Sequence, residues 1–370
     1  MAPKRRDVYR GRHRLRFPVT LVVSVVLILI IAAVVLFYSL QKYAVYGKDG
    51  VTLAIPGLTE APPVTESAAP AATQAPTQVN PVQAELVIEE ADYSAVDLSP
   101  GEGLRPVRGK YLSNTQLLTG AAGGLGVTAQ EDAAVVLEMV TPEGVLSWAS
   151  ESEIARGYGV NGQAELSELA AALKDRGYYL VAEVNCCRAT LLAKRYPALA
   201  LRNAADEPYV DTLGGWLDPY DLRVRSYLLA LTEELAEAGF DEILYSGLSF
   251  PENDAVVHYA SEHLGATTPR AAVSGLAVYL ARHAPEGVRL GVTLERSALY
   301  GASDPEKEAP QDAALFARLF DRLYLRTDAA NLEADAAKVS ALSDGDMTLR
   351  FVPLAAADTG TACCFTETAD

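Results

Sequence analysis

The sequence predicts an α/β fold, and within that class a (β/α)8 barrel of the TIM type. From about residue 104 onward, short apolar runs alternate with segments of helical periodicity. The central runs are apolar along their whole length, which is typical of parallel strands covered on both faces. Roughly 250 residues hold seven such units, a length that suits a barrel better than an open doubly wound sheet. We therefore assign residues 104–370 to the barrel.

The apolar runs predict seven strands, at residues 107–112, 133–140, 178–184, 241–247, 287–295, 321–327 and 347–354. Helices are expected at residues 164–176, 221–238, 270–283, 311–319 and 331–342. Gly239 should follow the helix at 221–238 as its C′ residue. Either residues 362–365 form an eighth strand, or the barrel is incomplete. The glycine-rich stretch 120–126 precedes a strand, so we expect a loop there and no phosphate-binding motif.

The N-terminus has the pattern of a single-pass membrane anchor. Residues 17–40, FPVTLVVSVVLILIIAAVVLFYSL, carry no charge and exceed the roughly 20 residues that a helix needs to cross a bilayer. A cleaved signal peptide has a shorter apolar core. Seven cations and Asp7 give residues 1–16 a charge of +6, which leaves −23 for the rest of this chain of net charge −17. By the positive-inside rule, the basic tail should lie in the cytoplasm and the barrel outside the cytoplasm.

Residues 41–103 are expected to form an extracytoplasmic stalk between the membrane helix and the barrel. Its segment 56–83 is rich in Pro, Ala and Thr and has almost no large apolar residues, which favours an extended chain. In polyproline II this segment would reach ~85 Å at ~3.1 Å per residue. A plain flexible linker without a distance requirement has the same composition.

Charge and cysteine content restrict the possible ligands. An acidic body argues against a nucleic-acid partner. Adjacent cysteines rarely bond each other, so Cys186-Cys187 and Cys363-Cys364 either pair across the two sites in an oxidising exterior or stay free. Neither pair belongs to a zinc motif and the chain has only 4 His, so we expect no metal and no cofactor.

Residues 214–251, GGWLDPYDLRVRSYLLALTEELAEAGFDEILYSGLSFP, carry a family resemblance. They resemble the most characteristic segment of a bacterial family of glycoside hydrolase-like (β/α)8 barrels, distantly similar to the α-amylases. The family pattern is W-x-D-P-Y, a helix, then G-F-D-E-I-Q-F-D-Y-x-R-F-P. The matching residues are Trp216, Asp218, Pro219, Tyr220, Gly239, Phe240, Asp241, Glu242, Ile243, Phe250 and Pro251. The resemblance extends over about residues 107–326, and it implies a carbohydrate substrate or ligand.

The chain departs from the family at the strand tips. The family's Asp, Tyr and Arg after strand four fall on Ser246, Gly247 and Ser249. Hydrolysis of a glycosidic bond needs two carboxyl groups that flank it. A serine cannot replace a carboxylate nucleophile without a neighbour that activates it, so the family's site on this strand has been lost.

Three glutamates remain at predicted C-terminal strand ends, the catalytic side of such barrels. Glu295 is the preferred proton donor, because the amylase-like class carries its donor after strand five. Glu138 or Glu183 would be the second carboxyl group. Glu295 can instead be a solvated strand-end carboxylate. Glu138 and Glu183 can instead form salt bridges with Arg188 and Arg326.

Four further residues are candidate substrate-binding residues: Trp216, Tyr220, Ser246 and Ser249. The two aromatic rings would stack on a sugar or, equally, clamp against the helix. Asp218 is expected to cap that helix, with Pro219 at its first position. Two functions stay open: a surface protein that binds or hydrolyses a cell-wall glycan or another polysaccharide, and a non-catalytic barrel that serves as a cell-surface scaffold or binding module.

Overall fold

The computed structural model describes residues 44–47, 50–53, 93, 95–118, 120–125, 132–252, 268–304 and 306–367. The chain divides into two compact units, Met1–Val82 and Gln83–Asp370. In the first unit, β1 (Ala44–Gly47) pairs antiparallel with β2 (Gly50–Leu53). The second unit contains the barrel. Its described part begins within the expected stalk, where the Leu98 amide already donates to the Arg318 carbonyl at 2.9 Å.

The basic tail 1–16, the apolar segment 17–40 and the Pro/Ala/Thr-rich segment 56–83 lie outside the described residues. Among the helices that the structure does describe, none combines the length and the apolar character needed to cross a bilayer. The membrane anchor therefore stays a prediction.

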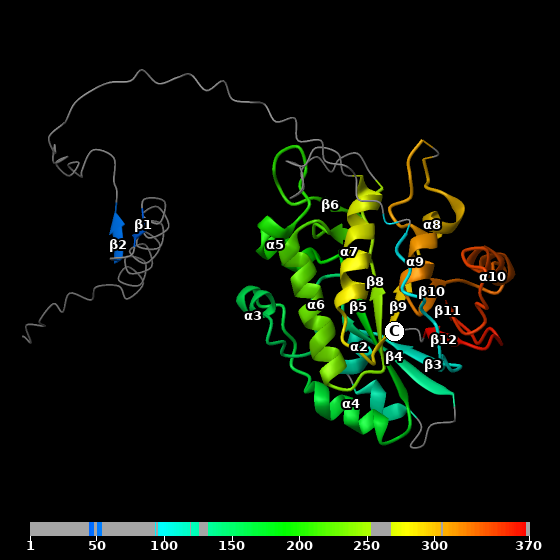
Figure 1. The fold of residues 1–370 in the computed structure, drawn as a ribbon. Coiled ribbons are helices and arrows are strands. Elements are labelled where there is room, and N and C mark those ends of the chain that lie inside the picture. Colours follow the sequence, from blue (N-terminus) through cyan, green and yellow to red (C-terminus); the bar gives the residue numbers. More distant parts are fainter. Residues whose placement is uncertain are drawn as a thin grey trace, which may run out of the picture. The chain divides into compact units, whose positions relative to one another are not determined.

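Eight parallel strands close into a barrel in the order β3-β4-β5-β8-β9-β10-β11-β12, which confirms the predicted fold (Figure 1). The strands are β3 (Arg108–Leu112), β4 (Ala133–Val140), β5 (Tyr179–Asn185), β8 (Glu242–Ser246), β9 (Arg289–Thr293), β10 (Arg322–Arg326), β11 (Phe351–Ala355) and β12 (Cys364–Glu367). The barrel is complete, because β12 bonds to both β11 and β3. Strand β12 overlaps the expected eighth strand at 362–365 and begins two residues later than predicted.

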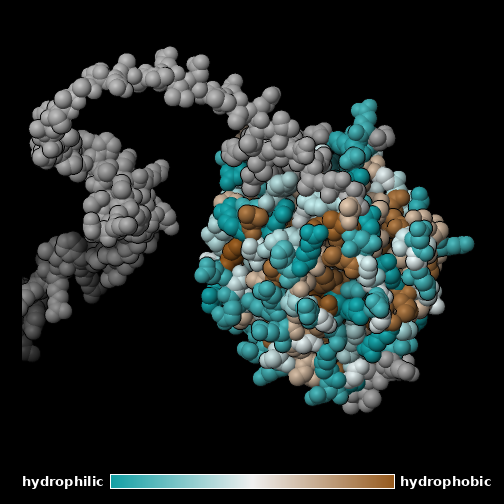
Figure 2. All heavy atoms as spheres, viewed as in Figure 1, coloured by the Kyte–Doolittle hydropathy of each residue, from teal (hydrophilic) through white to brown (hydrophobic). Residues whose placement is uncertain are grey.

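Helices surround the sheet, and α6 and α7 lie side by side on the face seen in Figure 1. The helices of this unit are α2 (Asn114–Leu118), α3 (Glu153–Tyr158), α4 (Leu166–Lys174), α5 (Thr190–Arg195), α6 (Leu222–Glu237), α7 (Pro269–His283), α8 (Arg296–Tyr300), α9 (Ala313–Leu319) and α10 (Leu332–Ser340). Two 3₁₀ helices, η1 (Ala121–Gly124) and η2 (Pro197–Leu199), and a small hairpin of β6 (Val210–Asp211) and β7 (Gly214–Gly215) complete the described elements. The glycine-rich stretch expected as a loop thus contains η1. Hydrophilic residues predominate on the face shown in Figure 2.

The start of α6 differs from the prediction. The capping residue is Asp221, whose side chain accepts a hydrogen bond from the Arg223 amide at 2.8 Å. Asp218 is buried and accepts from the Tyr220 amide at 2.8 Å, which makes a turn before the helix. The sequence Asp-Pro suggested a helix start, but the chain makes one more turn first. The end of the helix is as predicted, since Gly239 has a φ of 99° and a glycine adopts this conformation without strain.

Side chains inside the barrel form a core separate from the one between sheet and helices. This inner core consists of Val107, Tyr111, Ala134, Val136, Tyr179, Val181, Leu244, Tyr324, Val352, Leu354, Cys363 and Phe365. Successive strand residues point to opposite faces, so every second residue of each strand faces this interior. The interior is therefore a packed core rather than a channel.

A buried ion pair closes the N-terminal end of the barrel interior. Glu242 accepts hydrogen bonds from Arg322, from the Tyr179 hydroxyl at 3.0 Å and from the Tyr324 hydroxyl at 2.7 Å. Arg322 also donates to the Arg105 carbonyl at 2.7 Å. Both charged side chains are at most 1% exposed. We call Glu242, Arg322, Tyr179 and Tyr324 the plug. It stabilises the end of the barrel opposite the predicted site.

The cysteines are four buried free thiols. Cys186 and Cys187 follow the C-terminal end of β5, whereas Cys363 and Cys364 lie at the N-terminal end of β12. Of the two possibilities that the sequence left open, the structure has the free thiols, because the two pairs sit at opposite ends of parallel strands.

Candidate functional site

The C-terminal ends of the strands form a polar cup above the apolar interior. The strand register shows which inward side chains lie at the same height along the barrel axis, because inward residues of alternate strands form one layer in such a barrel. We call each layer a level. Val136, Leu244, Tyr324 and Phe365 form an apolar floor. The next two levels contain Tyr111, Glu183, Thr293 and Leu354, and then Glu138, Ser246, Arg326 and Glu367. We define the cup as the polar residues of these two levels together with Asn185, Ser249 and Glu295 at the strand ends.

Two of the predicted glutamates are neighbours in the cup. Glu138 and Glu183 are register partners on β4 and β5. The Tyr111 hydroxyl donates to Glu183, and the Asn114 amide donates to Glu138 at 2.8 Å. Burial raises the pKa of Glu138 above its ordinary value of 4.5, the Asn114 hydrogen bond opposes this shift, and the charge of Glu183 adds to it. The structure thus brings these two carboxyl groups together at one side of the cup.

Glu295 lies at the rim of the cup, directly after β9. It accepts a hydrogen bond from the Ser249 hydroxyl at 2.8 Å, and its amide donates to the side chain of Gln311 at 2.7 Å. Burial raises the pKa of Glu295 above 4.5, while Ser249 and the Arg188 guanidinium act in the opposite direction. A carboxyl group that keeps its proton to a higher pH is suited to donate it to a leaving group.

Arginines at the cup belong to two groups. The Arg326 guanidinium lies 5.5 Å from the centre of the Tyr111 ring and forms an ion pair with Glu367. Its charge also acts on Glu138. Arg188 follows β5 and acts on Glu295. Arg326 therefore forms its ion pair with Glu367, and it influences Glu138 only through the effect of its charge on the pKa.

The substrate-binding candidates divide into two kinds. Ser246 and Ser249 are buried in the cup, at the end of β8 and just beyond it. Trp216 does not reach the cup, because this residue is 2% exposed and its indole N–H donates to Asp211 at 3.0 Å. Trp216 belongs to the core between sheet and helices, which favours its alternative role as an apolar clamp, and stacking on a sugar stays an untested prediction. Tyr220 is half-buried, and the Arg225 guanidinium covers one face of its ring at 5.4 Å.

Several cup residues were not found from the sequence. Tyr111, Asn185, Thr293 and Glu367 all lie at inward positions of their strands. Tyr111 belongs to the inner core itself, and Glu367 lies two residues beyond the inner-core residue Phe365. Strict alternation from the buried residues would have identified them once the strand ends were known. The predicted strand ends missed them in both directions, because 287–295 runs past the observed end at Thr293 whereas 178–184 stops one residue before Asn185.

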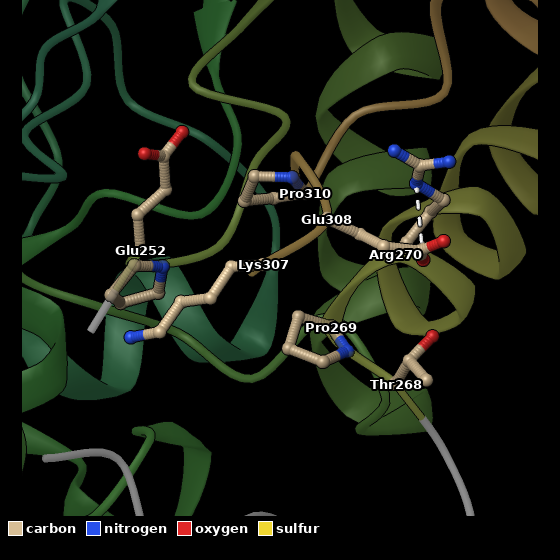
Figure 3. A pocket seen from close by; sticks show the side chains of 8 residues that line it. Glu252, Thr268, Pro269, Arg270, Lys307, Glu308 and Pro310 are labelled. Atoms are coloured by element: carbon tan, nitrogen blue, oxygen red, sulfur yellow. Dashed lines mark ion pairs between the residues drawn. The ribbon is translucent and has the colours of Figure 1, made fainter. Parts of the chain in front are cut away.

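A hollow of about 330 Å³ lies beside the rim. Its lining consists of Pro251, Glu252, Thr268, Pro269, Arg270, Lys307, Glu308 and Pro310. Figure 3 shows the side chains of Glu252 and Lys307 on one side of Pro269 and Pro310. The ion pair of Arg270 with Glu308, 3.6 Å apart, lies on the other side. The charge of Glu252 acts on Glu295, which connects this hollow electrostatically to the cup.

The described residues contain no group of three or more His, Cys, Asp or Glu side chains that could hold a metal ion. The thiol of Cys187, which lies after β5, is not a reactive group. Burial raises the pKa of Cys187 to about 12, and a thiol that stays protonated is a poor nucleophile.

The fold and the cup define a closed (β/α)8 barrel with carboxyl groups at the C-terminal ends of its strands. Residues 127–307 match a family model described as "Putative glycosyl hydrolase domain". The match includes Glu138, Glu183 and Glu295, and it confirms the resemblance to glycoside hydrolase-like barrels. The chain therefore contains a glycoside hydrolase-like domain.

Solved structures with a similar fold share little sequence with this chain. A hypothetical protein of Ruminiclostridium thermocellum is 20% identical with a TM-score of 0.41, over 50% of this chain and 96% of that one. An α-galactosidase of Thermus thermophilus in complex with stachyose is 14% identical with a TM-score of 0.37, over 52% of this chain and 40% of that one. Aspergillus fumigatus Ega3 in complex with galactosamine is 10% identical with a TM-score of 0.40, over 75% and 96%. Among curated proteins, none matches this sequence.

Proposed function

We propose that this protein binds a polysaccharide at the cup and hydrolyses its glycosidic bonds there. The observation that supports this best is Glu295, a largely buried carboxyl group with a raised pKa that is held by Ser249 at the rim of the barrel. Two further carboxyl groups, Glu138 and Glu183, lie in the same cup. A raised-pKa acid together with a second carboxylate is the set of groups that glycoside hydrolysis requires.

In this proposal Glu295 donates its proton to the glycosidic oxygen as the bond to the anomeric carbon breaks. Glu183 is the second carboxyl group, because the Tyr111 hydroxyl orients one of its oxygens. It either attacks the anomeric carbon or takes a proton from the water that attacks, and the separation of the two carboxyl groups decides between retention and inversion. Glu138 then acts as a neighbouring charge that influences Glu183.

The experiment uses the full-length protein in mild detergent and follows reducing ends released from chitotetraose, cellotetraose and maltotetraose. Glu295→Gln should lower the rate by a factor of about 10²–10⁴, the range for loss of a general acid, while sugar binding persists. Glu252→Gln is the matched control, since it removes the neighbouring carboxylate whose charge acts on Glu295, and it should leave most of the activity. Equal activity of Glu295→Gln and wild type would exclude this role.

A non-catalytic binding module is the second candidate function. The observation in its favour is that Ser246, Gly247 and Ser249 occupy the positions of the family's Asp, Tyr and Arg. Binding of the same oligosaccharides without any release of reducing ends, unchanged by Glu295→Gln, would support this function instead.

We also propose that residues 17–40 anchor the protein in the cell membrane with residues 1–16 in the cytoplasm and the barrel outside. The uncharged length of 17–40 and the charge of the basic tail support this orientation. Protease added to intact cells should then release the barrel by cutting in the stalk at 56–83. A barrel that resists this treatment until the cells are lysed would contradict the orientation.

A further inference from the structure

Three polar atoms on neighbouring strands of the cup have neither a hydrogen-bond partner nor access to solvent. They are Oδ1 of Asn185 on β5, Oγ of Ser246 on β8 and Oγ1 of Thr293 on β9. Asn185 and Ser246 are register partners and both are 5% exposed. Thr293 continues the same row, because Tyr245 pairs with Val292 on the next strand. We call these three residues the hydroxyl row.

Such a row is unusual in a protein interior. Buried polar atoms are nearly always paired, because leaving one unpaired costs its full desolvation free energy. The same chain satisfies a comparable group just outside the barrel, where the buried hydroxyl of Thr232 on α6 donates to the Leu228 carbonyl at 2.9 Å and pairs with the Tyr245 hydroxyl at 2.9 Å. The hydroxyl row therefore differs from a neighbouring buried hydroxyl of the same domain.

The arrangement of the unpaired atoms is particular to the cup. The other such side-chain atoms among the described residues lie singly, on two separate loops and on α6, in Asn161, Tyr209 and Tyr227. Only in the cup do they fall on three successive strands at the end where a barrel binds its ligands. We infer that a ligand, and not a local packing fault, accounts for the row.

The chemistry of the row selects a neutral polyhydroxylated ligand. An amide carbonyl accepts a hydrogen bond, and two hydroxyl groups can each donate or accept. None of the three side chains carries a charge. Adjacent strands are ~4.8 Å apart, so three strands present polar atoms across the width of a sugar ring. Glu183 precedes Asn185 by two residues on β5, and Glu295 follows Thr293 by two residues, just after β9. A ring bound at the row would therefore lie near both proposed catalytic groups.

The floor of the cup restricts how a ligand can reach the row. Val136, Leu244, Tyr324 and Phe365 close the barrel one level below Thr293 and two levels below Ser246, and all four are buried. A chain that passes through the barrel is therefore excluded, and only a terminal ring can descend to this depth. Because the three atoms are inaccessible in the free protein, the ring must displace the side chains packed over them.

We propose that Asn185, Ser246 and Thr293 bind the hydroxyl groups of the terminal sugar ring of a polysaccharide, and that the protein consequently acts on chain ends. This inference rests on the proposed carbohydrate function and identifies the part of the substrate that the cup takes. The hydroxyl groups of the sugar ring supply the hydrogen-bond partners that Oδ1 of Asn185 and the two hydroxyl oxygens lack.

The test compares binding with stability in the full-length protein. Ser246→Ala and Thr293→Val each remove one unpaired hydroxyl, so thermal stability should be unchanged or higher, whereas binding of the tetrasaccharides named above should weaken about tenfold, as expected for loss of one hydrogen bond. Thr232→Val is the matched control. It removes a paired hydroxyl outside the barrel, so thermal stability should fall and binding should not change.

A second measurement tests the chain-end preference. For the tetrasaccharide that binds, a longer polymer of the same linkage should compete in proportion to its number of chain ends and not in proportion to its mass. Competition in proportion to mass would exclude end-on binding.

The outcomes separate this inference from the proposed function. If wild type binds sugar and both row variants bind it equally well, the inference is wrong and the proposed function stands. If Ser246→Ala and Thr293→Val lose stability as Thr232→Val does, the hydroxyls have partners within the protein and the inference is also wrong. If wild type binds none of the three tetrasaccharides, the proposed function fails and the inference fails with it.

Discussion

The two ends of the barrel interior differ in how their polar groups are paired. At the N-terminal end, Glu242 accepts three hydrogen bonds, and its partners Arg322, Tyr179 and Tyr324 are all buried with it. At the C-terminal end, Oδ1 of Asn185 and the hydroxyl groups of Ser246 and Thr293 have no hydrogen-bond partner. Burial there raises the pKa of both Glu138 and Glu295. Both ends belong to the same eight strands with the same alternation of side chains. The paired end stabilises the fold, and the unpaired atoms at the other end are the basis of the ligand site that we propose there.

The largest effect is expected where the plug is broken. Arg322→Met leaves the buried Glu242 without its cationic partner, and removal of one member of a buried ion pair costs about 3–5 kcal/mol. Urea unfolding of the full-length protein measures this loss.

Arg326→Met is the matched control, because Arg326 is the other inward arginine of the same strand. Its ion pair with Glu367 is half exposed, with side chains 50% and 34% accessible, and such pairs contribute at most about 1 kcal/mol. Equal losses for the two variants would show that the ends of the barrel do not differ as described.

A smaller effect is expected at Gly247, which adjoins the hydroxyl row. Gly247 has a φ of 56°, and a Cβ atom there would lie 2.6 Å from Oδ1 of Asn185. Gly247→Ala should therefore lose about 1–2 kcal/mol of stability through backbone strain and displace Asn185, which should also weaken sugar binding. Differential scanning calorimetry and titration with the tetrasaccharides measure the two effects.

Gly120→Ala separates strain from the contact with Asn185. Gly120 has a φ of 81° and nothing within 4 Å of the position of a Cβ atom, so only the strain applies. If this variant weakened sugar binding as much as Gly247→Ala does, the role assigned to Asn185 would be wrong.

The smallest effect is expected in the pH dependence of stability. Because the folded-state pKa of Glu138 is raised above 4.5, the folded protein holds this proton more tightly than the unfolded chain. The contribution of Glu138 to stability is therefore fully present below pH 4.5 and falls as the pH rises through the raised pKa, with about 1.4 kcal/mol lost for every tenfold difference in proton affinity between the two states. Glu138→Gln removes this fall while it keeps an acceptor for the Asn114 amide. Urea unfolding at pH 4 to 8 should show that the free energy of unfolding of Glu138→Gln rises relative to that of wild type as the pH rises. Parallel curves for the two proteins would contradict the raised pKa of Glu138.

Much of the fold was predictable from the sequence because it depends on local patterns. The strand at 133–140 was predicted residue for residue, and the helix at 270–283 was predicted to within one residue. The eighth strand was ambiguous because β12 combines the apolar Cys364 and Phe365 with the polar Thr366 and Glu367. Only its hydrogen bonds to β11 and β3 identify it as a strand. The helix cap was misassigned because Asp218 and Asp221 both have the residue type that caps a helix, and the path of the loop decides between them.

The candidate site was predictable in part. The position of Glu295 after the fifth strand and those of Glu138 and Glu183 at strand ends follow from the order of strands along the chain. The burial of Trp216 and the identity of the hydroxyl row do not, because both depend on which segments pack over the strand ends. Ser246 was identified as the remnant of a family residue, and its unpaired hydroxyl became apparent only beside Asn185 and Thr293.

The sequence by itself therefore determined the barrel, its direction and the end at which carboxyl groups gather, since these follow from hydrophobic periodicity and from the rule that parallel strands end on one side. The tertiary structure alone decided which buried polar groups are paired. That property depends on the closure of the sheet and on the register between strands, which join residues distant in the chain. The plug links Tyr179, Glu242, Arg322 and Tyr324 across three strands, and nothing local in the sequence distinguishes these paired groups from the unpaired ones at the other end.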